Sequence, residues 1–165
     1  MKKYLILCVD DERDVLDGVL QDLECFEEHF IVEAAQSVEE AKEIIQECQE
    51  DEVTLALILC DHIMPEQNGI SFLIELSQEA ATKNTKKLLL TGQADLEDTV
   101  EAVNHSSLDF YIAKPWIGKE LRETITRQLT EYMIANEADL LPWAQVLDTE
   151  AIFNAISDKR MSFGE

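Results

Sequence analysis

Short apolar runs alternate with helical stripes along this 165-residue chain. Runs rich in Leu, Ile and Val are typical of strands that are buried on both faces. We expect such strands at residues 4–9, 30–35, 54–60, 87–91 and 109–113. Between the runs, apolar residues recur every three or four positions, which is the spacing of a helix with one buried face. The pattern therefore predicts alternating strands and helices.

The apolar stripes indicate where the helices lie, and a capping box formed by Ser37 and Glu40 opens the second of them. Strands that alternate with helices imply a parallel sheet covered on both faces, and right-handed crossovers favour one order. We expect an α/β fold, a flavodoxin-like doubly wound five-stranded parallel sheet with strand order 2-1-3-4-5. The stripes are Val15, Leu16, Val19, Leu20 and Leu23; Ala41, Ile44, Ile45 and Cys48; Ile70, Leu73 and Leu76; Leu96, Val100 and Val103; and Leu121, Ile125, Leu129 and Tyr132.

Length and composition fit one compact domain with an extension. With 46% hydrophobic residues the chain can bury a core, and we divide it into a domain at residues 1–130 and a helical C-terminal extension at 131–165. The fifth helix is expected to run on to about Ala138, and Asp148 or Thr149 to cap a short amphipathic helix. That helix would bury Ile152, Phe153 and Ile156.

The net charge of -22 limits the partners of the chain. Residues 1–130 carry 28 acids and 11 bases, residues 131–165 carry 7 acids and 2 bases, and neither part has a basic face. We therefore expect protein partners and no nucleic acid. The sequence has no apolar run of about 18 residues and no signal peptide at its start, which predicts a cytoplasmic protein with no membrane contact.

The four cysteines, Cys8, Cys25, Cys48 and Cys60, have no metal-ligand spacing. They fall in patterns that look like strand or helix interiors, which predicts free, buried thiols of a cytosolic protein. Cys60 precedes Asp61, but neighbouring residues of a strand face opposite sides of the sheet. We therefore interpret Cys60 as a core residue.

Acidic residues follow two of the predicted strands. Asp10 and Asp11 come directly after the first run, and Asp61 ends the third. Neighbouring parallel strands lie about 4.8 Å apart, so the three carboxylates would leave the same edge of the sheet. Carboxylates this close repel one another unless a proton or a hard cation intervenes, and Mg²⁺ prefers oxygen ligands. Asp11 could also simply cap the following helix.

Two further strand ends carry a hydroxyl and an ammonium, Thr91 and Lys114. With the acid pair and the single acid before them, these residues resemble the receiver domain of two-component response regulators, over roughly residues 3–130. The resemblance implies that Asp61 is the phosphoacceptor, assisted by Thr91 and Lys114, and that the donor is a histidine kinase or a phosphotransfer protein. Mg²⁺ would be held by Asp11 and Asp61, by Asp10 directly or through water, and by the backbone carbonyl of Ile63.

The resemblance also implies a conformational switch. In receivers the strand-4 hydroxyl moves toward the phosphate, and an aromatic residue three positions before the lysine turns inward; here these are Thr91 and Tyr111. The readout surface would comprise the fourth helix, the fifth strand and the fifth helix, including residues 96–104 and 118–129. The bond between Lys114 and Pro115 is usually cis in receivers. Tyr111 could instead be a plain, half-buried strand aromatic.

Two other interpretations fit parts of this pattern. A haloacid-dehalogenase-type phosphohydrolase also uses a strand-end Asp and Mg²⁺, but it needs a second Asp two residues on, where this chain has Ile63. A receiver-shaped binding module without phosphate chemistry would not need the complete set of acids, hydroxyl and lysine. We expect no separate enzymatic activity. Residues 131–165 could pack on the receiver, mediate a homodimer, or begin an output domain.

Overall fold

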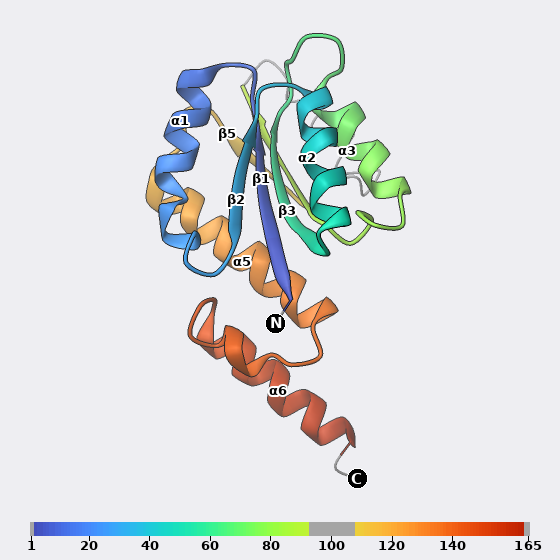
Figure 1. The fold of residues 1–165 in the computed structure, drawn as a ribbon. Coiled ribbons are helices and arrows are strands. Elements are labelled where there is room, and N and C mark those ends of the chain that lie inside the picture. Colours follow the sequence, from blue (N-terminus) through green and yellow to red (C-terminus); the bar gives the residue numbers. More distant parts are fainter. Residues whose placement is uncertain (1, 93–107, 164–165) are drawn as a thin grey trace.

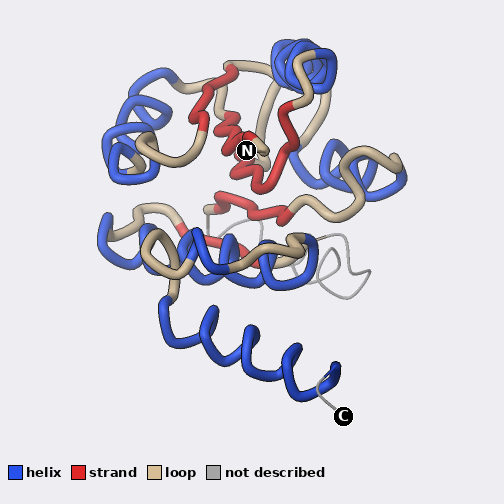
Figure 2. The backbone as a smooth tube through the Cα atoms, turned by 60° about the horizontal axis from the view of Figure 1, so that its bottom comes forward, coloured by secondary structure: helices blue, strands red, loops and turns tan. Residues whose placement is uncertain are grey.

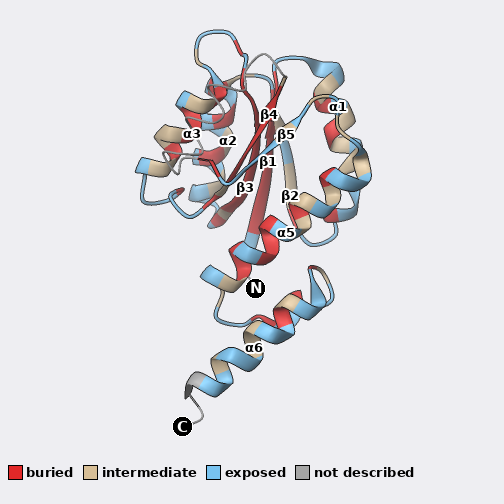
Figure 3. Cartoon of the chain, turned by 180° about the vertical axis from the view of Figure 1, so that it is seen from behind, coloured by how far each residue is buried: buried red, intermediate tan, exposed pale blue. Residues whose placement is uncertain are grey.

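The computed structural model describes residues 2–92 and 108–163. Five parallel strands form one sheet in the order β2-β1-β3-β4-β5, which confirms the predicted fold. Strands β1, β3 and β4 are almost wholly buried (Figure 3), because helices cover both faces of the sheet. The strands are β1 (Lys3–Val9), β2 (Ile31–Ala35), β3 (Val53–Asp61), β4 (Lys86–Thr91) and β5 (Phe110–Ala113).

Helices α1 and α5 cover one face of the sheet, and α2 and α3 cover the other (Figures 1 and 2). The predicted fourth helix, with Leu96, Val100 and Val103, lies outside the described residues. Within residues 2–92 and 108–163, no helix combines the length and the apolarity needed to cross a bilayer. The helices are α1 (Arg13–Asp22), α2 (Val38–Glu50), α3 (Gly69–Gln78), α5 (Gly118–Asn136) and α6 (Thr149–Phe163), with the 3-10 turns η1 (Glu24–Phe26) and η3 (Leu141–Trp143).

The strands separate two apolar cores by simple alternation. In β1, Leu5, Leu7 and Val9 belong to the core under α2 and α3, whereas Tyr4, Ile6 and Cys8 belong to the core under α1 and α5. Strand β3 departs from this pattern, because Leu5 and Ile6 of β1 pair with Leu55 and Leu57, leaving Ala56 as an extra residue. This bulge turns Leu55 and Leu57 to opposite faces, although they are two residues apart.

Side-chain caps fix where α2 and α6 begin. The Ser37 hydroxyl accepts the N–H of Glu40 at 3.1 Å, as the capping box predicts, while the Glu40 carboxylate accepts the N–H of Gln36. At the start of α6, the Asp148 carboxylate accepts the N–H of Ala151 at 3.1 Å. Thr149 instead donates its hydroxyl to the carbonyl of Ala144, so Asp148 is the cap.

The C-terminal segment continues the core beneath α1 and α5. The segment lies near the amino end of β1 (Figure 1). The residues buried in that core are Leu140, Trp143, Ala144, Leu147 and Ile152. Four aromatic rings contact one another there, and we refer to Tyr4, Phe30, Tyr132 and Trp143 as the aromatic cluster. Trp143 lies 5.6 Å from Tyr4 and 5.4 Å from Phe30 between ring centroids, and Tyr132 lies 5.8 Å from Tyr4.

Polar contacts fasten the same segment. The Tyr4 hydroxyl donates to the carboxylate of Glu137, just beyond α5, and the N–H of Asp148 donates to the Thr130 hydroxyl at 3.2 Å. Helix α5 ends at Asn136, two residues before the predicted end at Ala138, and Glu137 has extended backbone angles. Residues 137–148 therefore fold back to the sheet instead of continuing the helix.

Two details of the predicted burial are wrong. Phe153 is 49% exposed, because Ile152 points into the core and successive helical residues point about 100° apart. Cys25 is exposed, because the turn η1 buries Phe26 instead. The expectation is confirmed for Cys8 and Cys60, and Cys48 is half-buried. Burial raises the pKa of the Cys8 thiol to about 12 and also raises that of Cys60, so both thiols stay protonated near neutral pH.

Candidate functional site

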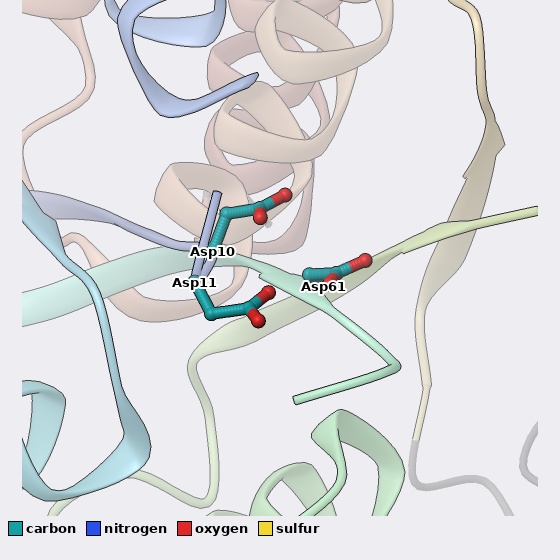
Figure 4. A group of neighbouring side chains, drawn as sticks. All are labelled: Asp10, Asp11 and Asp61. Carbon is teal, nitrogen blue, oxygen red and sulfur yellow. The ribbon is translucent and has the colours of Figure 1, made fainter. Parts of the chain in front are cut away.

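Three carboxylates gather at the carboxyl edge of the sheet (Figure 4). Asp10 and Asp11 follow β1, and Asp61 is the last residue of the neighbouring strand β3. One ligand oxygen from each lies within 4.8 Å of the others. Asp10 is 1% exposed and Asp61 is buried, whereas Asp11 is open to solvent. The structure thus brings together the three acids that the sequence assigns to one site.

Lys114 joins these acids from the end of β5. Its Nζ donates to Asp61 Oδ1 at 2.6 Å and to Asp10 Oδ2 at 3.3 Å. Its backbone N–H donates to the carbonyl of Thr91 at 2.9 Å, which fixes the start of the loop after β5. The peptide bond from Lys114 to Pro115 is cis, as expected. The ammonium therefore bridges the two buried carboxylates.

The charges of this site do not balance. Three carboxylates face one ammonium, which leaves two formal negative charges. Burial raises the pKa of Asp61; the hydrogen bond from Lys114 opposes this effect, and the charges of Asp10 and Asp11 add to it. Burial alone would lower the pKa of Lys114, but its hydrogen bond to Asp61 and the two carboxylate charges raise it overall. The lysine is therefore charged, and the excess negative charge favours a divalent cation.

The donor set that the described residues offer at this edge fits Mg²⁺, because its ligand atoms are carboxylate oxygens. The oxygens differ in their availability. Asp10 Oδ1 accepts the N–H of Glu12 at 2.9 Å, and Asp10 Oδ2 faces Lys114. Asp61 uses Oδ1 for Lys114, and Asp11 is exposed. Asp11 and Asp61 are therefore the acids best placed to touch a metal directly, and Asp10 is better placed to act through water.

The loop after β3 holds Asp61 in place through a close backbone contact. The N–H of Gly69 donates to the carbonyl of His62 at 2.8 Å, and the Asn68 side chain caps α3 by accepting the N–H of Ser71. A Cβ atom on Gly69 would lie 2.2 Å from the carbonyl oxygen of Asp61. Only glycine fits there. The sequence marks this position as Asn68-Gly69, but not the contact with Asp61. Ile63 lies in this loop with its side chain exposed.

Thr91 and Tyr111 occupy different surroundings. Thr91 is buried at the end of β4, and its hydroxyl donates to the carbonyl of Gly92 at 3.0 Å. Tyr111 is 43% exposed and stacks on Phe110 with 6.2 Å between ring centroids. Strand register pairs Asp61 with Leu90 and Thr91 with Ala113, so the hydroxyl lies at the same edge as Asp61 and Lys114. The Tyr111 side chain on β5 is instead exposed to solvent.

Comparison with known proteins extends over most of the chain. Residues 6–126 match the family model of the response regulator receiver domain. The hydrogenase transcriptional regulatory protein HoxA of Cupriavidus necator is 31% identical over 130 residues, which cover 79% of this chain and 25% of that protein. The phosphate regulon transcriptional regulatory protein PhoB of Escherichia coli is 32% identical over 116 residues, covering 70% of this chain and 47% of that protein. The chain thus spans about a quarter to a half of these relatives.

A solved structure gives the same result for the fold. The CheY-like response regulator receiver domain protein of Methanospirillum hungatei superposes with a TM-score of 0.65 and 32% identity, covering 80% of this chain and 97% of that one. The matched family region includes all four strand ends that carry Asp10, Asp61, Thr91 and Lys114.

Proposed function

The chain belongs to the response regulator receiver domain family, and from this premise we propose that it is a phosphorylation-dependent signalling switch with Asp61 as phosphoryl acceptor. One observation carries the assignment to Asp61. Lys114 Nζ lies 2.6 Å from Asp61 Oδ1 inside a group of three acids. A carboxylate beside a fixed ammonium is a nucleophile with a ready partner for the phosphoryl oxygens.

Phosphoryl acceptance requires the protein to position Asp61 and to stabilise charge on the phosphoryl oxygens. An oxygen of Asp61 attacks the phosphorus in line, the bond from phosphorus to the donor breaks, and its electron pair leaves with the donor. The product is an acyl phosphate on Asp61. Lys114 Nζ pairs with the Asp61 carboxylate before the transfer and is placed to pair with the phosphoryl oxygens after it. Burial and the charges of Asp10 and Asp11 raise the pKa of Asp61, and the hydrogen bond from Lys114 stabilises its ionised form.

Mg²⁺ is the cofactor that these residues would hold. The carboxylates of Asp11 and Asp61 and the carbonyl of Ile63 would bind it directly, and Asp10 would bind it through water. When bound, the ion supplies positive charge that offsets the repulsion between the carboxylates and the phosphoryl oxygens. The chain's own contribution is to keep Asp61 and Lys114 aligned at the sheet edge.

Readout would pass through Thr91 and Tyr111. In the present structure the Thr91 hydroxyl is bonded to Gly92, and the Tyr111 ring is stacked outside on Phe110. A phosphoryl group on Asp61 would attract the Thr91 hydroxyl, and the space left behind would admit the Tyr111 ring. Phosphorylation would thereby shift the population between two surfaces of β5 and α5. The fourth helix, including residues 96–104, is the remaining part of the proposed surface and lies outside the described residues.

The partners follow from the same proposal. The phosphoryl donor would be a histidine kinase or a phosphotransfer protein in the cytoplasm, and the receiver of the signal a downstream protein, an output domain or a second copy of the chain. HoxA and PhoB are named as transcriptional regulatory proteins, and most of HoxA and about half of PhoB lie outside the region matched here. We propose no catalytic activity beyond phosphoryl acceptance and slow hydrolysis.

The test is phosphorylation by a small-molecule donor. The purified chain is incubated with Mg²⁺ and acetyl phosphate, and its intact mass is measured. We expect one phosphoryl adduct on the wild type and on Asp17→Asn, which replaces an exposed acid of α1. Asp61→Asn should remain unmodified, because an amide oxygen cannot form the acyl phosphate. The absence of an adduct on the wild type, or an adduct on Asp61→Asn, would overturn the proposal.

A further inference from the structure

The backbone of Lys114 is held by its N–H bond to the carbonyl of Thr91 and by the loop that follows it. Strand β5 has four residues, lies at the edge of the sheet and, among the described strands, pairs with β4 alone. Beyond Lys114, Pro115 and Ile117 are exposed, so they give the loop little packing. Trp116 is the exception, because it is half-buried and packs against the core under α1 and α5. Whatever holds Trp116 therefore also holds the backbone of Lys114, two residues earlier.

Trp116 is held by helix α1. Its indole Nε1 donates to Asp22 Oδ2 at 2.7 Å. Its ring lies over Gly18, one helical turn earlier, where an added Cβ would be 3.7 Å from ring atom Cζ2. The hydrogen bond and the ring contact together place the indole against the last turn of α1.

The charge of Asp22 is unfavourable at the end of α1, but its carboxylate is a good acceptor for the Trp116 indole. Asp22 is the last residue of α1, where a negative charge opposes the helix dipole, and α1 has no basic residue in its last turn. Its carboxylate instead faces the start of α5. A Cβ on Gly118 would lie 2.7 Å from Asp22 Oδ1, and Arg122 Nη1 lies 3.6 Å from the same oxygen. Trp116 and Arg122, which are favourable partners of Asp22, belong to the loop after β5 and to α5.

Helix α1 therefore connects two parts of the site. At its first end it follows Asp10 and Asp11, and at its last end Asp22 holds Trp116. Helix α1 is thereby linked to Lys114 at both ends, because Lys114 Nζ donates to Asp10 Oδ2 and also to Asp61 Oδ1. We propose that the pair Asp22–Trp116 is a lock that positions Lys114 for phosphoryl transfer, an inference that rests on the proposed function of Asp61. Neither residue touches the reacting atoms, so both are positioning residues.

The test compares variants that break the lock with variants that keep it. Trp116→Phe removes the indole N–H but keeps an aromatic ring, and Asp22→Ala removes the acceptor. Both should slow adduct formation with acetyl phosphate about 5- to 20-fold, since small misplacements of a catalytic group are costly. Asp22→Asn keeps an acceptor oxygen and should restore the rate to within about threefold of the wild type. Gly18→Ala adds a methyl group at ordinary contact distance and should change the rate less than about twofold.

Two further measurements separate positioning from general damage. Rates are taken at a temperature where every variant is fully folded, and Mg²⁺ affinity is measured without a phosphoryl donor. Breaking a lock that acts on Lys114 should not weaken Mg²⁺ binding, because the ammonium would move away from Asp10 and Asp61. Distortion of α1 would instead move Asp11 and weaken Mg²⁺ binding. The chain has two tryptophans, so its NMR spectrum has two indole N–H signals. The signal that is missing in Trp116→Phe should shift in Asp22→Ala and return toward its position in Asp22→Asn.

The outcomes distinguish this inference from the proposed function. If the wild type forms no adduct, the proposed function fails, and this inference fails with it. If the wild type is phosphorylated but Trp116→Phe and Asp22→Ala react at its rate, the lock is overturned and Asp61 keeps its role. An indole signal that does not respond to Asp22→Ala, or a rate loss matched by weaker Mg²⁺ binding, would overturn the lock as well.

Discussion

The two ends of strand β1 lie in opposite chemical surroundings. Tyr4, near its amino end, belongs to the aromatic cluster with Phe30, Tyr132 and Trp143. Asp10, six residues later and about 20 Å away along an extended chain, faces two other carboxylates and one lysine. The amino end gains stability from packing, whereas the carboxyl end keeps like charges together at a cost in stability. Such a division is expected when a protein holds a reactive site on a rigid scaffold.

The largest expected effect lies at the amino end. Trp143→Ala should lower the free energy of unfolding by about 3–5 kcal/mol, because it removes a buried ring that contacts both Tyr4 and Phe30. The measurement is a urea denaturation curve. Leu141→Ala is the matched control in the same 3-10 turn, since Leu141 is 62% exposed, and it should change stability by less than about 0.5 kcal/mol.

The same variant examines how independent the two ends are. At a temperature where Trp143→Ala is fully folded, its initial rate of phosphorylation should equal that of the wild type. A slower reaction of the folded variant would show that the aromatic cluster influences Asp61 and Lys114, and the division between the ends would then be wrong.

Gly69→Ala should have the next largest effect, and it should affect both properties. The added Cβ would lie 2.2 Å from the Asp61 carbonyl oxygen, so the loop or the end of β3 must move. We expect a loss of about 1–3 kcal/mol in unfolding free energy, with slower phosphorylation of the folded variant. Gly18→Ala is the control, because its Cβ has room and alanine favours a helix, so stability should rise by about 0.5–1 kcal/mol. Equal stabilities of the two variants would contradict the close contact at Asp61.

Much of the site could be predicted because it follows from regular structure. Asp10, Asp11 and Asp61 end apolar runs, and a parallel sheet of order 2-1-3-4-5 brings those strand ends together. Lys114 could be placed at the same edge for the same reason. Strand order and the side to which a strand end points depend on local pattern and handedness, and both can be read from a sequence.

Contacts between irregular segments could not be predicted in this way. The aromatic cluster joins Tyr4 to Trp143 across most of the chain, and no periodic pattern links them. The bond from Trp116 to Asp22 is of the same kind, since it joins a loop to a helix end. The predicted burial of Cys25 is wrong because the 3-10 turn η1 turns its neighbour Phe26 inward instead. The predicted burial of Phe153 is wrong because its neighbour Ile152 points into the core at the edge of the helix.

The smallest expected effect is a gain in stability at the carboxyl end. Because its folded-state pKa is raised by burial and by Asp10 and Asp11, ionised Asp61 opposes folding at neutral pH despite its bond to Lys114. Asp61→Asn should therefore raise the free energy of unfolding by about 0.5–2 kcal/mol without Mg²⁺. A raised folded pKa means that the folded state binds the proton more tightly than the unfolded state, so the wild type loses stability as pH rises through that pKa. The advantage of Asn should shrink as pH falls from 7 toward the unfolded value near 4.

Mg²⁺ should make the wild type more stable than Asp61→Asn. The comparison with and without Mg²⁺ therefore separates the repulsion between the carboxylates from their role as metal ligands. A ligand that binds only the folded state stabilises it by about 2.7 kcal/mol at one hundred times its dissociation constant. The wild type should gain this increment, whereas Asp61→Asn, which lacks one of the proposed ligands, should gain much less. Asp17→Asn, an exposed acid of α1, should follow the wild type in both conditions. If Asp61→Asn were less stable than the wild type without Mg²⁺, the bond to Lys114 would outweigh the repulsion, and the carboxyl end would be a stabilising ion pair like any other.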